Sequence, residues 1–388
     1  MFRIGEEEVA AVRETLLGKR MWRYQRDSQT ERFEHALSQK MASGYALALA
    51  SGTGALIAGL TALGIGPGDE VLVPAYTYIS TAIAPLAVGA VPILVEVDET
   101  LTMDASDLRR KITPRSRAVI PVHINGHPCD MDRILAVAAE HGISVLEDAC
   151  QSVGGSYRGR RLGTLGEMGA FSFNFYKIIS CGEGGAVLTR DPVLYERARI
   201  YHDSGLCFFS PGQEAPVPLF AGVSLRISEV LSAILNVQLE RLDGILDDLR
   251  TIKHGIGSQI GQGPDWRLSP MHDADGDCGI KLGILLDTPE RVVSVLDRLR
   301  ADKFPLGLEC PFYSERHVYI NWEAVLEQRG AAHPLRNPFR ETPVPYTADM
   351  CPATLDALRR TLYVMVNPDL DTAAAAEAGR RVRRALEG

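Results

Sequence analysis

The chain has 388 residues, of which 46% are hydrophobic and 23% are charged, and its formal net charge is −8. This composition is typical of a globular protein with a large core, and the length predicts two or three domains. The negative charge argues against nucleic acid or an anionic membrane as a partner, and no apolar run approaches the roughly 20 residues of a membrane span.

Short apolar runs alternate with helical patterns between about residues 44 and 190. Strands are expected at 45–50, 70–74, 91–97, 118–122 and 143–147. Helices are expected from near Gly54, at 79–88, at 104–112 with Asp104 as N-cap, and at 131–141. Such runs predict parallel strands buried on both faces, in a three-layer α/β/α domain whose ligands bind beyond the carboxyl ends of the strands.

The second half of the chain predicts a smaller α+β domain. One long helix is expected at 227–250, followed by a strand at 279–286 and helices at 289–302 and 372–386. The resulting division is a large domain with an N-terminal arm at 1–245 and a small domain at 246–388. Residues 208–221 and 306–350 are rich in Pro, Gly and aromatic residues and are expected to form loops that border the active site.

Lys177 stands between an aromatic, strand-like run and a glycine-rich turn. Most lysines are surface residues, but the apolar neighbours of this one predict that the segment is buried: Phe171, Phe173, Phe175, Tyr176, Ile178 and Ile179. A lysine amine in an apolar surrounding is easier to deprotonate and can act as a nucleophile. Lys177 is therefore the first candidate for catalysis.

Asp148 ends an apolar strand, where an aspartate is either a turn residue or a functional carboxylate. A lysine held near a fixed carboxylate is what a pyridoxal 5′-phosphate (PLP) enzyme requires. Lys177 would form a Schiff base with the aldehyde, and Asp148 would keep the pyridine nitrogen protonated. Gln151 is placed to hydrogen-bond the ring hydroxyl oxygen.

Ser51-Gly52-Thr53-Gly54 follows a strand and opens a helix, a setting that suits an anion such as a phosphate. An ordinary strand-to-helix turn is the alternative. A dinucleotide fingerprint is disfavoured because its third glycine would fall at Ile57.

Two further segments leave their roles open. An aromatic of Tyr76-Thr77-Tyr78 either stacks on a planar cofactor ring or packs in the core. His123, His127 and Cys129 are interrupted by Gly126 and Pro128, which indicates a loop, and no metal site is expected.

These segments together resemble the DegT/DnrJ/StrS family of PLP-dependent sugar and cyclitol aminotransferases, which have the fold type I structure of aspartate aminotransferase. The resemblance covers residues 1 to about 245. It implies that Lys177 is the Schiff-base lysine, Asp148 the pyridinium partner and Gln151 the ring-hydroxyl partner. It also implies phosphate contacts from Gly52, Thr53 and Ser172, and a stacking role for Tyr78.

The resemblance further implies a homodimer with shared active sites. The family's Gly-x-Asn-x-Arg stretch reads here as residues 222–226, so that Ser224 replaces the Asn that usually contacts the phosphate from the partner chain. Whether Ser224 still makes this contact is open.

The predicted activity is transfer of an amino group, from glutamate or glutamine, to a keto-sugar or keto-cyclitol. The expected context is the biosynthesis of amino sugars for antibiotics, other secondary metabolites or cell-surface sugars. The alternatives are a dehydratase or other elimination enzyme of the same family, a non-catalytic PLP-binding protein, and a nicotinamide-dependent oxidoreductase. The absence of a signal-peptide pattern and the seven scattered cysteines predict reduced thiols and a cytoplasmic location.

Overall fold

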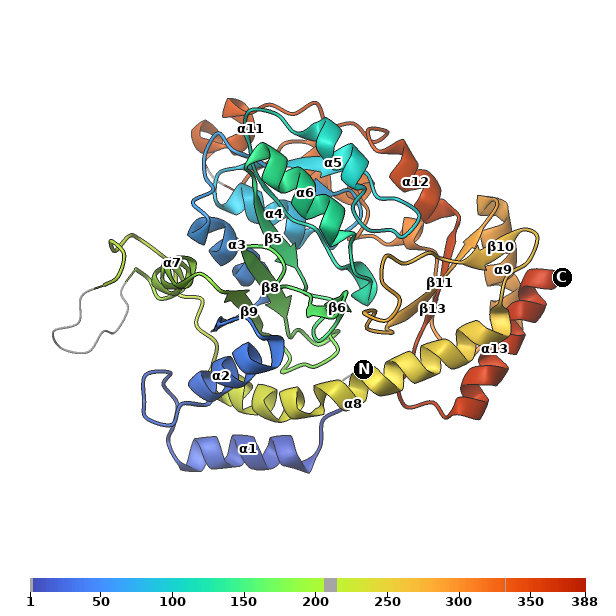
Figure 1. Cartoon of the computed structure of the whole chain (residues 1–388), viewed down its shortest axis with the longest axis horizontal. Helices are drawn as coiled ribbons and strands as arrows, with labels where there is room; N and C mark the ends of the chain where they lie inside the picture. Colours follow the sequence, from blue (N-terminus) through green and yellow to red (C-terminus); the bar gives the residue numbers. More distant parts are fainter. Residues whose placement is uncertain (1–2, 206–214, 332) are drawn as a thin grey trace.

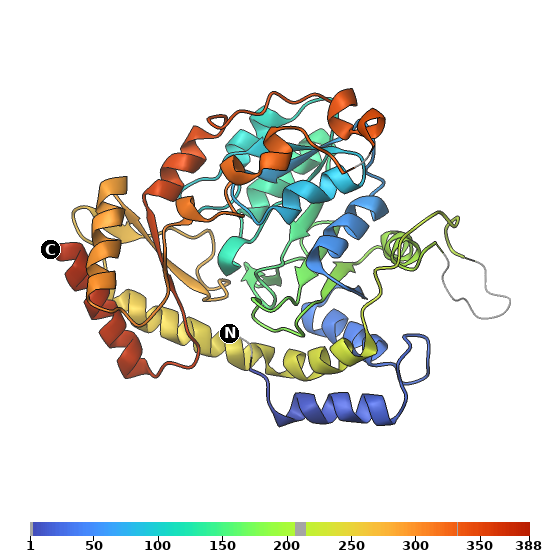
Figure 2. The ribbon, with the colours of Figure 1, turned by 180° about the vertical axis from the view of Figure 1, so that it is seen from behind.

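A computed structural model describes residues 3–205, 215–331 and 333–388 of the chain. It shows a large region built on one sheet and a smaller region at the far end of a long helix (Figures 1 and 2). The expected loop at 208–221 lies partly outside the described residues. Of the helices in these described ranges, none has both the length and the apolar character needed to cross a bilayer.

The large sheet, as far as the chain is described, has seven strands in the order β1-β9-β8-β5-β4-β2-β3. They are β1 Tyr45–Leu49, β2 Glu70–Pro74, β3 Val91–Val95, β4 Ser116–Val119, β5 Ser144–Asp148, β8 Met168–Ser172 and β9 Gly185–Thr189. Neighbouring strands pair in parallel along the stretch β8-β5-β4-β2-β3, whereas β9 runs antiparallel to both β8 and β1. The carboxyl ends of β1, β2, β5 and β8 therefore lie at the same edge of the sheet.

Helices cover both faces of this sheet, as the three-layer prediction requires (Figure 1). They are α2 Gln29–Met41, α3 Gly52–Ala62, α4 Ser80–Ala87, α5 Ala105–Lys111, α6 Met131–His141 and α7 Pro192–His202. The short helix η1 Ile124–Gly126 stands in the loop after β4, and α1 Glu6–Leu17 packs on the long helix Glu229–Ile260 and not on the sheet. Because side chains alternate along a strand, Val71 and Val73 pack in one core cluster with α3 and α4. Leu72 lies between them and packs on the opposite face with α5 and α6. A two-stranded hairpin, β6 Ser156–Tyr157 with β7 Arg160–Arg161, follows β5.

One helix, α8 (Glu229–Ile260), joins the two regions (Figure 1). The sequence predicts that this helix ends near residue 250, but it continues to Ile260. The reason is that Ile252, Ile256 and Ile260 extend its buried stripe, which packs against α13 (Thr372–Glu387). The expected domain division after residue 245 falls inside this helix and stays a prediction.

The smaller region contains an antiparallel sheet in the order β10-β11-β13-β12. Its elements are β10 Trp266–Leu268, β11 Lys281–Leu286, α9 Pro289–Ala301, β12 Leu308–Glu309 and β13 Thr361–Met365. The strand at 279–286 and the helices at 289–302 and 372–386 are confirmed within a few residues. The sequence patterns do not predict β13, which lies next to β11 in the middle of this sheet.

The segment 306–350 returns to the large sheet. It contains the short helices η2 Pro311–Tyr313, η3 Tyr319–Asn321, α10 Glu323–Leu326, η4 Pro334–Arg336 and α11 Pro338–Glu341, and α12 Pro352–Arg359 follows it. Val318 forms a bridge with Tyr76, and the carbonyl of His317 accepts a hydrogen bond from the backbone N–H of Thr77 at 2.9 Å. This pairing holds the segment beside the carboxyl end of β2.

Candidate active site

Asp148 lies at the carboxyl end of β5, in the middle of the large sheet, and is buried. Its Oδ2 accepts a hydrogen bond from Thr81 Oγ1 at 2.7 Å, and its Oδ1 accepts one from the backbone N–H of Cys150 at 3.1 Å. Thr81 Oγ1 is also 2.8 Å from Thr77 Oγ1. These contacts fix the orientation of the carboxyl group at the edge where the strands end.

Lys177 lies in the loop between β8 and β9. Its backbone N–H donates to the carbonyl of Asn174 at 3.0 Å, and a bridge between Asn174 and Gly182 closes the base of the loop. The side chain is partly buried. Among the described residues its amine has no hydrogen-bond or ion-pair partner, so that it remains available for a ligand.

The prediction that aromatic residues bury this loop is only partly correct. Phe171 and Phe173 are fully buried, but Phe175 is 58% exposed and Tyr176 is 76% exposed. The two differ because they stand in a turn beyond β8, where the strand alternation that buries Phe171 and Phe173 no longer applies.

Asp148 ends β5, and Lys177 follows the end of β8, the parallel neighbour of β5 in the sheet. Burial raises the pKa of the Cys150 thiol well above its usual range, the charge of Asp148 raises it further, and the charge of Lys177 lowers it. Both charged groups therefore act on one side chain at the floor of the site. A carboxyl group and a free amine at this edge are what PLP requires of a protein.

The amino end of α3 has the form of a phosphate site. Ser51 is its N-cap and accepts a hydrogen bond from the backbone N–H of Gly54 at 3.0 Å. A Cβ at Gly52 would lie 2.7 Å from Ser172 Cβ, so the glycine is required for the first turn of α3 to meet β8 this closely. Thr53 Oγ1 is 2.8 Å from Ser80 Oγ. Free backbone N–H groups and hydroxyls at a helix amino end suit a phosphate, and these residues fit PLP.

Gln151 is oriented by a residue that the sequence analysis does not single out. Its Oε1 accepts a hydrogen bond from the backbone N–H of Asn125 at 2.8 Å. Asn125 is buried and has left-handed backbone angles, φ 53° and ψ 24°. Since the backbone N–H is a donor, the amide oxygen of Gln151 must face it, and the NH₂ group faces the other way.

Tyr78 and His317 form the more open side of the site. Tyr78 is 38% exposed, and its ring centroid lies 5.5 Å from that of His317. His317 Nδ1 is 2.9 Å from Ser314 Oγ. Burial and the charge of Lys281 lower the pKa of His317 to about 4, and Lys177 acts in the same direction. The imidazole is therefore neutral near pH 7 and lies close to the candidate catalytic amine.

Ser224 precedes Leu225, whose carbonyl accepts a hydrogen bond from the backbone N–H of Ala50 at 2.8 Å. Ser224 is exposed, and its backbone forms a bridge with Asp203. The next residue but one, Arg226, forms an ion pair with the buried Asp203, which also accepts a hydrogen bond from Tyr24. Within the described ranges, no hydrogen bond joins Ser224 to Gly52, Thr53 or Ser172.

His123 forms a structural pair that the sequence does not identify. Its Nδ1 accepts from the backbone N–H of Cys129 at 3.1 Å, and its Nε2 lies 3.0 Å from Glu147 Oε2. Glu147 also accepts hydrogen bonds from three backbone N–H groups, those of Gly163, Leu165 and Gly166. Within the described ranges, no group of three or more His, Cys, Asp or Glu side chains is arranged to hold a metal ion.

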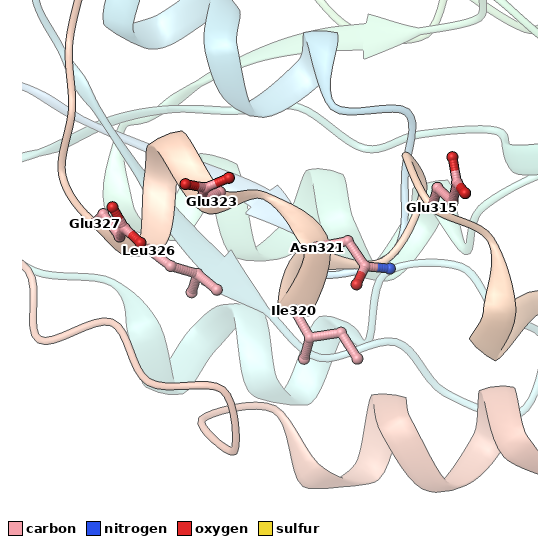
Figure 3. A pocket seen from close by; sticks show the side chains of 6 residues that line it. All are labelled: Glu315, Ile320, Asn321, Glu323, Leu326 and Glu327. Carbon is pink, nitrogen blue, oxygen red and sulfur yellow. The ribbon is translucent and has the colours of Figure 1, made fainter.

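A surface hollow of ≈ 500 Å³ lies on the segment 306–350 (Figure 3). It is lined by Glu315, Ile320, Asn321, Glu323, Leu326 and Glu327. Three carboxylates do not suit a phosphate, and none of the predicted site residues lines this hollow. It is therefore distinct from the candidate active site.

The fold and the site define a PLP-dependent enzyme of the fold type I class. The model of the DegT/DnrJ/EryC1/StrS aminotransferase family matches residues 3–302, and the chain belongs to this family. Membership favours the aminotransferase interpretation over the nicotinamide alternative.

Curated relatives match over part of their length. The chain is 43% identical over 212 residues to a GDP-perosamine synthase of Caulobacter vibrioides, covering 54% of this chain and 56% of that protein. It is 41% identical over 223 residues to a dTDP-3-amino-3,4,6-trideoxy-alpha-D-glucose transaminase of Streptomyces venezuelae, covering 57% of each. The chain thus matches little more than half the length of these relatives.

Solved structures match over nearly the whole chain. DesV of S. venezuelae superposes with a TM-score of 0.81 at 29% identity, covering 99% of this chain and 95% of that one. A 3-amino-5-hydroxybenzoic acid synthase superposes with a TM-score of 0.82 at 25% identity, covering 100% and 99%. The predicted fold type I architecture is confirmed.

Proposed function

We propose that this protein is an aminotransferase that uses PLP bound at Lys177 to move an amino group from an amino acid to a keto-sugar or keto-cyclitol. One observation carries the proposal: a buried carboxyl group held by Thr81 ends β5, and an amine without a partner among the described residues stands in the loop after β8, the parallel neighbour of β5. The names of the curated relatives, a GDP-perosamine synthase and an amino-sugar transaminase, support a sugar acceptor.

Each residue would have a defined task toward the cofactor. When bound, PLP supplies an electron sink for negative charge at the carbon that carries the amino group. Lys177 Nζ would hold the cofactor and then carry the proton to and from the substrate carbon as base and acid. Asp148 would hold the proton of the pyridine nitrogen, and Thr81 keeps Asp148 in place.

The other predicted contacts would anchor the cofactor. Gly52, Thr53 and Ser172 would bind the phosphate at the amino end of α3. Gln151 would donate to the ring hydroxyl oxygen, and Tyr78 would stack on the ring.

The acceptor would enter on the side of Tyr78 and His317. The neutral imidazole of His317 lies close enough to Lys177 to be affected by that charge, and it belongs to a segment beyond the family match. We propose that His317 hydrogen-bonds the acceptor and that glutamate or glutamine is the donor. Transfer to a ketone is preferred to elimination because Lys177 supplies an amine that both accepts and returns a proton.

A second copy of this chain would complete the site. Three apolar or aromatic side chains next to site residues in sequence are exposed: Phe175 by 58%, Tyr176 by 76% and Val223 by 45%. Among the described residues, Ser224 makes no hydrogen bond to the phosphate residues of its own chain. We propose a homodimer in which Ser224 contacts the phosphate of the partner's cofactor. Replacing Ser224 with Asn should tighten PLP binding, measured by the concentration dependence of absorbance, whereas Ser228→Asn should not.

Two expectations about organisation remain proposals. The chain would divide into units at 1–245 and 246–388, with α8 as the shared element. Cytoplasmic location would keep the thiols reduced, in agreement with six unpaired cysteines among the described residues.

Borohydride reduction of the protein incubated with PLP, followed by peptide mapping, tests the central assignment. The pyridoxyl label should be found on Lys177 and should be lost in Lys177→Ala. Lys281→Ala is the control, because Lys281 is a neighbouring basic residue that pairs with Glu309 at 2.5 Å. A label on Lys281, or on any other lysine in the wild type, would overturn the assignment. A screen of nucleotide-linked keto-sugars, free keto-sugars and keto-cyclitols against the pyridoxamine form then identifies the acceptor.

A further inference from the structure

The loop after β4 connects the cofactor site with the small sheet. Its central residue, Asn125, donates its backbone N–H to Gln151 at 2.8 Å, and the following Gly126 accepts a hydrogen bond from the backbone N–H of Cys278 at 3.1 Å. A Cβ at Gly126 would lie 2.6 Å from Cys278 Cβ. The loop is therefore packed between Gln151 on one side and the 276–280 segment on the other.

The side chain of Asn125 is buried near two tyrosines, and its Nδ2 has no hydrogen-bond partner among the described residues. Asn125 is 5% exposed, Tyr76 is 1% exposed and Tyr363 is fully buried. Burial raises the pKa of each tyrosine hydroxyl above its usual range, and the Asn125 amide opposes this shift in both. Tyr76 follows β2 of the large sheet and Tyr363 belongs to β13 of the small sheet, so that Asn125 contacts both regions.

The backbone of Asn125 is in a conformation that few residues accept. Its φ of 53° lies in the left-handed region, where asparagine is among the best tolerated of the non-glycine residues. This conformation aims the backbone N–H at Gln151 Oε1. If the backbone left this region, Gln151 would lose the donor that fixes its amide, and either end of the amide could then face the cofactor.

We propose that Asn125 is a positioning residue that fixes the amide of Gln151 so that its NH₂ group, and not its oxygen, faces the ring oxygen of the cofactor. The inference rests on the proposed PLP function. A donor at this point draws negative charge from the ring oxygen. That oxygen then stabilises the protonated Lys177 imine less well, and the pKa of the imine is lower than it would be without the donor.

The test is a pH titration of the visible absorbance of the PLP-loaded protein, which reports the pKa of the imine without any turnover. Gln151→Ala should raise this pKa by about one unit, the effect of one hydrogen bond to a charged group. Asn125→Ala, which disfavours the left-handed backbone, should raise it by a similar amount. Asn125→Gly retains access to that backbone and should stay close to the wild type.

Two further variants make the result specific. In the Gln151→Ala background, Asn125→Ala should add no further shift, because the residue acts only through Gln151. Lys303 has a similar φ of 50° but is exposed and far from Gln151 in sequence, so Lys303→Ala should lower the melting temperature without moving the imine pKa.

The inference is overturned if Asn125→Ala leaves the imine pKa unchanged while Gln151→Ala raises it, or if the two shifts add in the double variant. No shift in Gln151→Ala would overturn it as well. If Asn125→Ala does not fold, Asn125→Gly serves as the test. The inference is then overturned if the imine pKa of Asn125→Gly is as high as that of Gln151→Ala. A wild type that forms no imine at Lys177 would instead refute the proposed function itself.

Discussion

The edge of the large sheet and the segment 303–388 both contribute residues to the candidate site, but they do so in different ways. At the sheet edge, Asp148 and Ser172 each end a strand, and Lys177 follows within a short loop. His317 comes from a long segment that returns to the sheet from the smaller region. The family model covers residues 3–302 and stops before that segment. On the proposed function, the sheet edge would provide the cofactor chemistry, and the later segment would shape the acceptor side.

The largest effect is expected at Asp148. Asp148→Asn keeps the shape of the side chain but removes its negative charge, so PLP should still bind while both half-reactions slow by about 10²-fold or more. Single-turnover absorbance changes with the donor amino acid and with the ketone measure the two halves separately. Unchanged rates would remove Asp148 from the mechanism.

His317 tests whether the two regions divide the work. His317→Ala should slow only the acceptor half-reaction, by about fivefold to tenfold for one lost hydrogen bond, and leave the donor half-reaction unchanged. Arg316→Ala is the matched control, since Arg316 is an exposed neighbour. An equal loss in both half-reactions would show that the segment also supports the cofactor.

Replacing Thr81 at the sheet edge should slow the half-reactions by a smaller factor. Thr81→Val removes the hydrogen bond of 2.7 Å to Asp148 and should slow both half-reactions by the same factor, about threefold to tenfold. Thr61→Val is a suitable control, because its hydroxyl bonds only to the carbonyl of Ile57 within α3. A loss confined to one half-reaction would contradict the role given to Thr81.

Lowering the pH should reduce the free energy of unfolding through a buried histidine in each region. Burial, as the largest cause, lowers the pKa of His202 to about 3 and that of His317 to about 4. The unfolded chain takes up these protons near pH 6.5, before the folded chain does, so the free energy of unfolding should fall as the pH drops from 6.5 toward 4. Urea unfolding at pH 7, 5 and 4 measures this, and His202→Gln should weaken the dependence whereas the exposed His35→Gln should not.

Much of the sheet edge can be predicted from the sequence because its signals are local. Val71-Leu72-Val73 reads as a buried strand, and Asp148 marks a strand end. The sequence places the end of α8 too early, because the buried stripe through Ile256 becomes clear only once α13 packs against it. β13 is missed although Thr361–Met365 is an apolar run of the same length as β2, so the sequence carries a local signal for this strand as well.

The contacts around the site are harder to predict. Lys177 and Asp148 stand in recognisable segments. Asn125-Gly126 is a turn signal typical of positive φ, but the sequence does not show which side chain the backbone N–H of Asn125 meets. His317 is far from Tyr78 in sequence, and only the pairing of residues 316–319 with the chain after β2 brings them together. The exposure of Phe175 and Tyr176 also depends on where β8 ends.

The continuity of α8 limits how the two regions can move relative to each other. Its 32 residues span about 48 Å as one continuous rod, and both regions are packed onto it. The connection between the two regions through α8 is helical, so it offers no flexible linker about which the smaller region could rotate. Any closing motion over a bound substrate must either bend the rod or tilt it against α2 and α1, which also lie along it. Gly244, in the middle of α8, is exposed and a Cβ there would meet nothing within 4 Å, so a bend would cost least at this glycine.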